Sequence, residues 1–277
     1  MLSAKPHFVR VASGRVAVRI HGAGQSILLC HGNSCSSRAF EKQLASSLPE
    51  RFRLIAIDLP GHGDSDPAEA PEKTYRLPGY ADTIAAVAKE LGALEGVFVG
   101  WSLGGHAVLE ATDRLPSAAG FLIFGAPPIA SFAQFGSVAS ANPVLGAAFR
   151  EDATDEEVRT LTGLFVRPGS PAPQTFFEDF RRTHKRARAE LAASAGRNEL
   201  RDEVRIVSEL TKPLAIAHGA HDAVFVKRAW LDELTMPTLW RGRVQDIGDA
   251  GHAPQWESPE SFNRILEDFA NDCFGGG

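Results

Sequence analysis

Short, continuous apolar runs alternate with segments of helical periodicity along most of the chain. The runs are SILLC (26–30), FRLIAIDL (52–59), GVFVG (96–100), GFLIFGA (120–126), PLAIAHG (213–219) and RVQDIG (243–248). Such runs are typical of strands that are buried on both faces of a sheet. Helical patterns lie between most of them, over 38–48, 79–92, 103–115, 227–235 and 259–274. The alternation predicts right-handed βαβ units and an α/β fold with a mostly parallel central sheet flanked by helices.

Two segments depart from this alternation. HFVRVA and RVAVRI, on either side of Ser13 and Gly14, alternate apolar and polar residues and predict a β-hairpin. About 85 residues without a strand pattern separate GFLIFGAPP from KPLAIAHG, far more than a crossover needs. We therefore expect an inserted helical cap over 127–212, with a core formed by 1–126 and 213–277. TDEEVRTLTGLF opens with a capping box from Thr154 to Glu157, and PQTFFEDFRRTHKRARAELAASA predicts a long helix.

Composition and charge narrow the possible partners. The chain has 277 residues, is 44% hydrophobic and carries a formal net charge of −5, which argues against nucleic acid and anionic membranes as partners. No apolar run approaches the length of a bilayer span, and the first residues lack the apolar core of a signal peptide. Three cysteines, Cys30, Cys35 and Cys273, leave one unpaired in any disulfide scheme. We therefore expect a reduced, cytoplasmic protein.

The segment FVGWSLGGHAVLE (98–110) places Ser102 between an apolar run and a helical pattern. The pattern G-x-S-x-G alone is weak, because a glycine-rich turn whose serine caps a helix has the same letters. A strand followed by a helix is, however, the context that a nucleophile elbow requires. Gly100, Gly104 and Gly105 supply the small residues that so tight a turn needs. We interpret Ser102 as a nucleophile at a helix N-terminus, where developing negative charge is favoured.

A serine hydroxyl needs a base that accepts its proton. DIGDAGHAPQWESPE supplies His252 on a loop after the last predicted strand. AIAHGAHDAVF places Asp222 just beyond the preceding strand, where its carboxylate could orient the imidazole. Asp246 and Asp249 lie closer to His252 in sequence, and we interpret them as surface or turn residues. The predicted catalytic residues are therefore Ser102, Asp222 and His252.

Acyl transfer also needs N–H donors for the oxyanion of the tetrahedral intermediate. The residue after the nucleophile, Leu103, supplies one expected donor. Asn33, in the loop ILLCHGNSCSSRAF, supplies the second through its backbone N–H. Residues expected to bind substrate are Trp101, His31, Ser34 and Leu161. Further apolar cap residues either line the pocket or form the cap's own core: Phe132, Phe135, Leu145 and Phe165.

Taken together, HGNSCSS, AIDLPGHGDSD, GWSLGGH, HGAHD and DAGHAPQWESPE resemble the α/β-hydrolase superfamily, in which the order along the chain is Ser, Asp, His. The segments HGNS, DLPGHG, GWSLGGH and AGHAP further resemble its serine-dependent N-acyl-homoserine lactonases. The resemblance implies an α/β-hydrolase fold with a helical cap. It also implies that a lactone, and hence a quorum-sensing signal, is hydrolysed through an acyl-enzyme without a cofactor.

Several alternatives depend on the same residues. A carboxylesterase of unknown small-ester specificity is the main one, and a carbon–carbon bond hydrolase or a non-catalytic binding protein of the same fold is more distant.

The predicted cap contains no tyrosine, which departs from the lactonases, because Tyr75 and Tyr80 lie elsewhere. GHGDSD lacks the H-x-H-x-D-H cluster of metallo-lactonases, so no catalytic metal is expected. His62 and Asp58 in DLPGHG are expected to form a structural turn.

Overall fold

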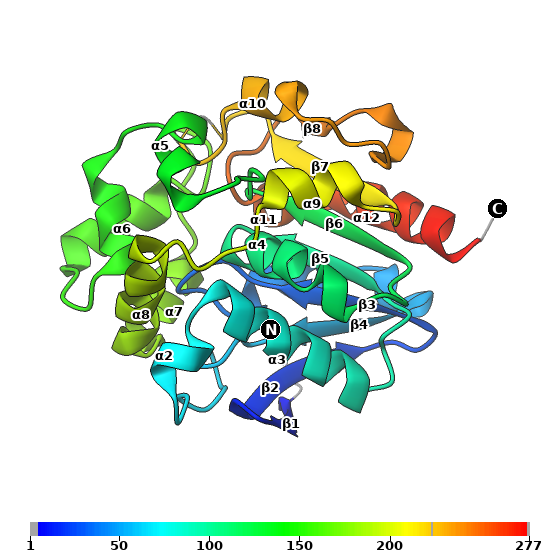
Figure 1. Ribbon diagram of the computed structural model, residues 1–277, viewed down its shortest axis with the longest axis horizontal. Coiled ribbons are helices and arrows are strands. Elements are labelled where there is room, and N and C mark those ends of the chain that lie inside the picture. Colours follow the sequence, from blue (N-terminus) through cyan, green and yellow to red (C-terminus); the bar gives the residue numbers. More distant parts are fainter. Residues whose placement is uncertain (1–4, 223, 276–277) are drawn as a thin grey trace.

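An eight-stranded sheet runs through the centre of the molecule, with helices on both of its faces (Figure 1). The computed structural model describes residues 5–222 and 224–275. Within them the strands are His7–Val11 (β1), Gly14–His21 (β2), Gln25–Cys30 (β3), Phe52–Ile57 (β4), Val97–Trp101 (β5), Gly120–Phe124 (β6), Leu214–Gly219 (β7) and Gln245–Ile247 (β8). Their order across the sheet is β1-β2-β4-β3-β5-β6-β7-β8.

The strand pairing confirms the predicted mostly parallel sheet and the predicted hairpin. Strands β4, β3, β5, β6, β7 and β8 pair in parallel with their neighbours. Strands β1 and β2 form an antiparallel hairpin in which Val11 lies opposite Gly14, and β2 pairs antiparallel with β4. The loops that follow the parallel strands therefore meet at one edge of the sheet.

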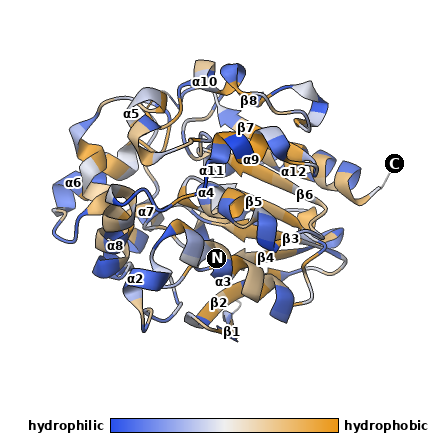
Figure 2. Ribbon diagram, viewed as in Figure 1, coloured by the Kyte–Doolittle hydropathy of each residue, from blue (hydrophilic) through white to orange (hydrophobic). Residues whose placement is uncertain are grey.

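The central strands read as continuous apolar runs because both of their faces are buried. In β3, Leu28 and Cys30 belong to a hydrophobic cluster on one face, while Ile27 and Leu29 belong to a second cluster on the other. Helices α3 (Leu77–Glu90) and α4 (Leu103–Glu110) cover the first face, and α12 (Pro259–Phe274) covers the second. Figure 2 shows the strands as the most hydrophobic part of the ribbon.

The predicted helix over 38–48 is the clearest departure from expectation. The chain there forms a 3₁₀ helix, Ser37–Phe40 (η1), and a single turn, Glu41–Leu44 (α1), before a second 3₁₀ turn, Leu48–Glu50 (η2). The Ser46 hydroxyl donates to the Gln43 carbonyl and accepts from Leu48 N–H, so a side chain replaces helical hydrogen bonds at this point. The other core helices are α2 (Pro71–Thr74), η3 (Thr112–Arg114), α10 (Arg228–Glu233), η6 (Trp240–Gly242) and α11 (Pro254–Glu257).

The long connection between β6 and β7 contains helices and no strand among the described residues. Its helices are η4 (Phe132–Gln134), α5 (Phe135–Val138), η5 (Pro143–Phe149), α6 (Asp155–Gly163), α7 (Gln174–Arg182), α8 (Lys185–Gly196) and α9 (Glu203–Glu209). The capping box is present, because Thr154 and Glu157 bond each other's backbone N–H. Helices α5 to α8 lie together at one end of the sheet, whereas α9 packs against α4 (Figure 1).

The predicted long helix in this connection is wrong, because the chain forms two helices, α7 and α8. Thr183 and His184 between them have non-helical ψ angles of 132° and 122°. His184 N–H donates to the Gly61 carbonyl at 2.8 Å instead of continuing the helix. The backbone bond ties this connection to the turn after β4.

All three cysteines are free thiols. Cys30 at the end of β3 and Cys35 in the loop that follows are completely buried, and burial raises the pKa of Cys30 to about 12. Burial, with a smaller contribution from Asp179, also raises the pKa of Cys35. Among the described helices, none combines the length and apolar character that crossing a membrane requires.

Candidate active site

Ser102 occupies a sharp turn between β5 and α4. Its φ of 53° and ψ of −119° lie in a region that residues with a side chain rarely adopt. Ser102 N–H donates to the Phe124 carbonyl at the end of β6, and its own carbonyl accepts from Gly105 N–H at 2.8 Å. A Cβ at Gly100 would overlap the carbonyl of Gly104, which explains the small residues around the turn. The geometry is that of the strand–turn–helix elbow expected from the sequence.

His252 is held by contacts on several sides. Its Nδ1–H donates to Oδ2 of Asp222 at 2.7 Å, and both side chains are almost completely buried. Asp222 in turn accepts from Phe225 N–H at 3.1 Å, and the Phe225 ring stacks on the imidazole with centroids 3.9 Å apart. Trp101 Nε1–H donates to the His252 carbonyl at 2.8 Å. Because the ionised carboxylate only accepts, the proton lies on Nδ1, and Nε2 is the nitrogen left to take a proton.

An apolar cavity of about 340 Å³ joins these groups. Most of the expected site residues line it: Asn33, Trp101, Ser102, Leu103, Leu161 and His252. Phe132, Phe135, Leu145 and Phe165 line it as well, from the connection between β6 and β7. The cavity therefore lies between the strand ends of the core and this helical segment.

Two residues that we expected to bind substrate, His31 and Ser34, lie outside the lining of this cavity. His31 is fully buried, donates from Nδ1 to the Gly32 carbonyl and accepts from Leu59 N–H at Nε2. Burial lowers the pKa of His31 to about 4, so the ring is neutral near pH 7. Its two hydrogen bonds connect the loop after β3 with the loop after β4. Ser34, with a φ of 56°, is buried and donates to the side chain of Asn33.

The loop after β3 approaches the elbow closely. A Cβ on Gly32 would lie 3.3 Å from Cβ of Ser102. The Asn33 side chain donates to the Ala148 carbonyl at 2.8 Å and accepts from Ser34, so its polar atoms are already engaged. Leu103 is the first residue of α4, and its N–H has no partner within the helix. These backbone positions border the space around the Ser102 side chain.

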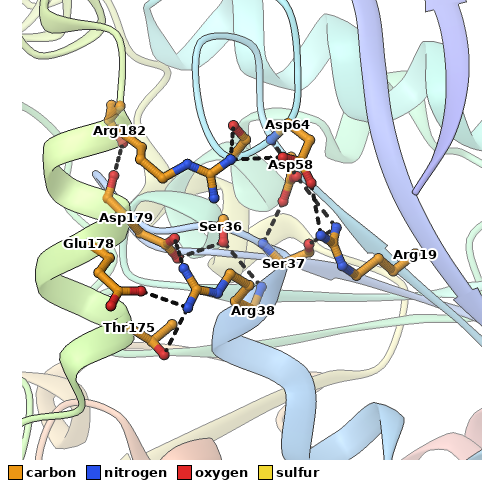
Figure 3. A network of polar contacts seen from close by, with 12 residues as sticks. Arg19, Ser36, Ser37, Arg38, Asp58, Asp64, Thr175, Glu178, Asp179 and Arg182 are labelled. Atoms are coloured by element: carbon orange, nitrogen blue, oxygen red, sulfur yellow. Dashed lines mark hydrogen bonds and ion pairs between the residues drawn. The ribbon is translucent and has the colours of Figure 1, made fainter. Parts of the chain in front are cut away.

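Two buried acids, Asp58 and Asp179, form hydrogen bonds with the loop after β3 (Figure 3). Asp58 accepts from Ser37 N–H at 2.6 Å, and Asp179 of α7 accepts from the Ser36 hydroxyl at 2.5 Å. Arg38 donates to the other Asp179 oxygen at 3.0 Å. Burial raises the pKa of Asp179 to about 6, against the opposing effects of Ser36 and Arg38. The loop is therefore attached both to the core and to the segment between β6 and β7.

The expected structural role of DLPGHG agrees with its contacts. Asp58 also accepts from Asp64 N–H at 2.9 Å, and His62 bonds the Pro60 carbonyl through Nδ1. Burial and the neighbouring His31 lower the pKa of His62 to about 3. In the two described ranges, no group of three or more His, Cys, Asp or Glu side chains is placed to hold a metal ion.

Sequence reasoning missed three residues that shape the site. His106 and Phe225 line the cavity, and Asp179 anchors the loop after β3. His106 could have been found, because it follows Ser102 by one helical turn and so faces the same side of α4. Asp179 could not, because its partner Ser36 lies 143 residues away in sequence.

Comparisons with known proteins agree with this geometry. A model of the "Alpha/beta hydrolase family" matches residues 27–265. A solved structure of a variant of the N-acyl homoserine lactonase AidH, complexed with N-hexanoyl homoserine lactone, is 33% identical, covers 98% of both chains and superposes with a TM-score of 0.92. A putative aryl esterase from Burkholderia cenocepacia is 26% identical over 98% of this chain and 100% of that chain, with a TM-score of 0.82. A 2-hydroxy-6-oxononadienedioate/2-hydroxy-6-oxononatrienedioate hydrolase from Burkholderia vietnamiensis is 26% identical over 96% of each chain. The chain belongs to the α/β-hydrolase family.

Proposed function

We propose that the protein is a serine hydrolase that opens N-acyl homoserine lactones through an acyl-enzyme. The observation that carries the proposal is that Ser102, on a strained turn, and His252, bonded to buried Asp222, line one apolar cavity. This arrangement supports acyl transfer to water. The likeness to AidH supports the choice of lactone, because AidH structures contain N-hexanoyl homoserine lactone and N-butanoyl homoserine.

In the first step, Oγ of Ser102 attacks the ring carbonyl while Nε2 of His252 accepts the hydroxyl proton. The hydrogen bond from His252 Nδ1 to Asp222 stabilises the imidazolium that forms. The N–H groups of Leu103 and Asn33 stabilise the oxyanion, and the N-terminal end of α4 adds a favourable dipole. These donors are backbone groups, so they keep their positions while charge develops.

Collapse of the tetrahedral intermediate breaks the ring C–O bond, and His252 returns its proton to the departing oxygen. The new hydroxyl stays attached to the acyl group on Ser102, so prompt protonation prevents the ring from closing again. Water, deprotonated by His252, then attacks the ester and releases N-acyl homoserine with Ser102 restored. One water is consumed for each lactone opened.

We propose that the acyl chain occupies the apolar part of the cavity. We propose that residues 127–212 include a helical cap over this cavity, formed by helices η4 to α8. Apolar residues of this segment line the cavity opposite the strand ends: Phe132, Phe135, Leu145, Leu161 and Phe165. Helix α9 packs against α4 and belongs with the core in this division. A cytoplasmic enzyme of this kind would inactivate lactone signals that enter the cell.

The test compares two substrates of equal acyl length, N-hexanoyl homoserine lactone and p-nitrophenyl hexanoate, with EDTA present. We expect lactone opening in EDTA, and a loss of kcat of about 10⁴-fold in folded Ser102→Ala. Turnover of the aryl ester without ring opening would replace the lactonase with a carboxylesterase. That second candidate stands because nothing in the Ser102, Asp222 and His252 geometry requires a cyclic ester. Full activity in folded Ser102→Ala would exclude both.

A further inference from the structure

His106 is a polar side chain of the cavity that the proposed reaction does not use. Among the described residues that line it, the polar side chains near the turn are Asn33, Ser102, His106 and His252. His106 lies on α4, one helical turn after Ser102, or about 6 Å along the helix axis. The lining of the same cavity is otherwise mostly apolar, and includes Leu77, Ile129 and Leu191.

His106 has a carboxylate partner of its own. Its Nδ1 lies 2.9 Å from both carboxylate oxygens of Glu203, whose side chain is fully buried at the start of α9. Glu203 also accepts from Ile129 N–H at 3.0 Å. An ionised carboxylate offers no proton, so Nδ1 of His106 carries one and donates it. Nε2 bonds none of the residues that the structure describes, and in the neutral ring it can accept a hydrogen bond.

An acceptor on the wall of this cavity has a chemical counterpart in the proposed substrate. In an N-acyl homoserine lactone, the amide nitrogen is attached to the carbon next to the reacting carbonyl. Its N–H must lose water when the acyl chain enters an apolar cavity, and it then needs an acceptor close to the reacting carbon. A simple alkyl ester carries no such donor.

Resting on the proposed function, we infer that His106, oriented by Glu203, is a substrate-binding residue that accepts the amide N–H of the acyl group. The pair gives the site a preference for acylamino lactones over substrates that carry the same chain without an N–H. The hydrogen bond exists both in the bound substrate and in the transition state. Its loss therefore raises KM more than it lowers kcat.

A matched pair of substrates isolates this contact. N-Hexanoyl homoserine lactone and α-hexanoyloxy-γ-butyrolactone have the same ring and chain length, but the second has an ester oxygen in place of the amide N–H. In His106→Leu we expect kcat/KM for the amide to fall about tenfold, the effect of one neutral hydrogen bond, while that for the ester stays within about twofold. The readout is kcat/KM for the amide divided by kcat/KM for the ester.

Glu203→Gln provides a second variant that keeps the imidazole. A glutamine has one acceptor oxygen, which Ile129 N–H requires, so its NH₂ group faces Nδ1 of His106. The imidazole proton then moves to Nε2, which becomes a donor and no longer accepts the amide N–H. We expect the same loss of preference for the amide as in His106→Leu, in a protein whose cavity shape is unchanged.

Glu110→Gln is the matched control. Glu110 is a buried carboxylate on the same helix, accepts from Arg201 N–H at 2.8 Å, and does not line the cavity. Its variant should keep the wild-type ratio. Equal losses for both lactones in the His106 and Glu203 variants would overturn the inference and assign the pair a purely structural role. Failure of the wild type to open either lactone would overturn the lactonase itself, and the inference with it.

Discussion

The Ser36 hydroxyl donates a 2.5 Å hydrogen bond to the fully buried carboxylate of Asp179, and so joins the loop after β3 to helix α7. Arg38, two residues further along the loop, donates to the other oxygen of the same carboxylate (Figure 3). The loop that carries Asn33 therefore depends on a residue of the proposed cap. Separation of α7 from the core would break these bonds and leave the loop attached to the core through Asp58.

Asp179 should make stability depend on pH in an unusual direction. Burial raises its pKa to about 6 in the folded protein, compared with about 3.9 in an unfolded chain. The folded state therefore binds the proton more tightly, and this stabilising contribution is lost as the pH rises from about 4 to about 6. The size is on the order of 3 kcal/mol. Urea unfolding across this range should show the loss in wild type and not in Asp179→Asn.

Asp152→Asn is the control for that measurement, because Asp152 is 84% exposed and its contact with Arg150 is 3.7 Å long. This variant should follow the wild-type pH dependence of the free energy of unfolding. If Asp179→Asn follows it too, then the Asp179 carboxyl titrates normally in the folded protein.

Asp222→Asn should reduce kcat by about 10⁴-fold with folding intact, because an amide at this position disturbs the imidazole tautomer. Asp249 is the comparison, since it lies three residues from His252 but is 85% exposed and faces Arg167. Asp249→Asn should keep nearly full activity in the same assay. If Asp249→Asn lost activity while Asp222→Asn kept it, Asp249 would be the acid that orients His252.

Gly125→Ala should lower activity because the added methyl group displaces His252. Gly125 has a φ of 61°, and a Cβ there would lie 2.7 Å from Cε1 of His252 and 3.2 Å from Trp101. We expect a lower kcat together with a loss of about 1–3 kcal/mol in unfolding free energy. Gly163→Ala, at the end of α6, meets no atom within 4 Å and should leave activity unchanged. Wild-type kcat in Gly125→Ala would show that the imidazole tolerates this displacement.

Phe132 and Phe135 should set the preference for acyl length. Each buried methylene is worth about 0.8 kcal/mol, or roughly a fourfold gain in kcat/KM per added carbon. In Phe132→Ala or Phe135→Ala this gain should shrink, while a substrate with an acetyl group reacts as before. Phe8→Ala, in an exposed position of β1, should keep the wild-type profile. An unchanged profile in both cavity variants would exclude these residues from acyl selection.

The sheet could be predicted because its physical cause is local: strands buried on both faces produce apolar runs. The elbow at Ser102 could be predicted for a similar reason, since strand, small residues and helix follow one another in sequence. The helix over 38–48 could not, because Ser46 bonds the backbone with its side chain. His31 was expected in the pocket, but its ring turns away to accept from Leu59 N–H, 28 residues along the chain.

Contacts between residues that lie far apart in sequence are hard to predict from the sequence alone. Glu203 lies 97 residues from His106, and no local pattern relates the two. Asp222 and His252 are 30 residues apart, and they could be paired because each follows a predicted strand in the order that a catalytic triad requires. The sequence predicts a residue's neighbours along its own strand or helix, whereas partners on other elements require the assembled fold.

The reactivity of the two buried thiols, Cys30 and Cys35, reports how often the parts of the fold around them open. Cys35 lies in the loop held by Asp179, and Cys30 lies in the strand before it. A cysteine reacts with thiol reagents as the nucleophilic thiolate, which burial makes both scarce and inaccessible in the closed molecule. The labelling rate of Cys35 thus measures how often the loop leaves the core, and that of Cys30 how often the sheet opens. A bound substrate analogue that slowed only the first would register the tightening of the loop around its ligand.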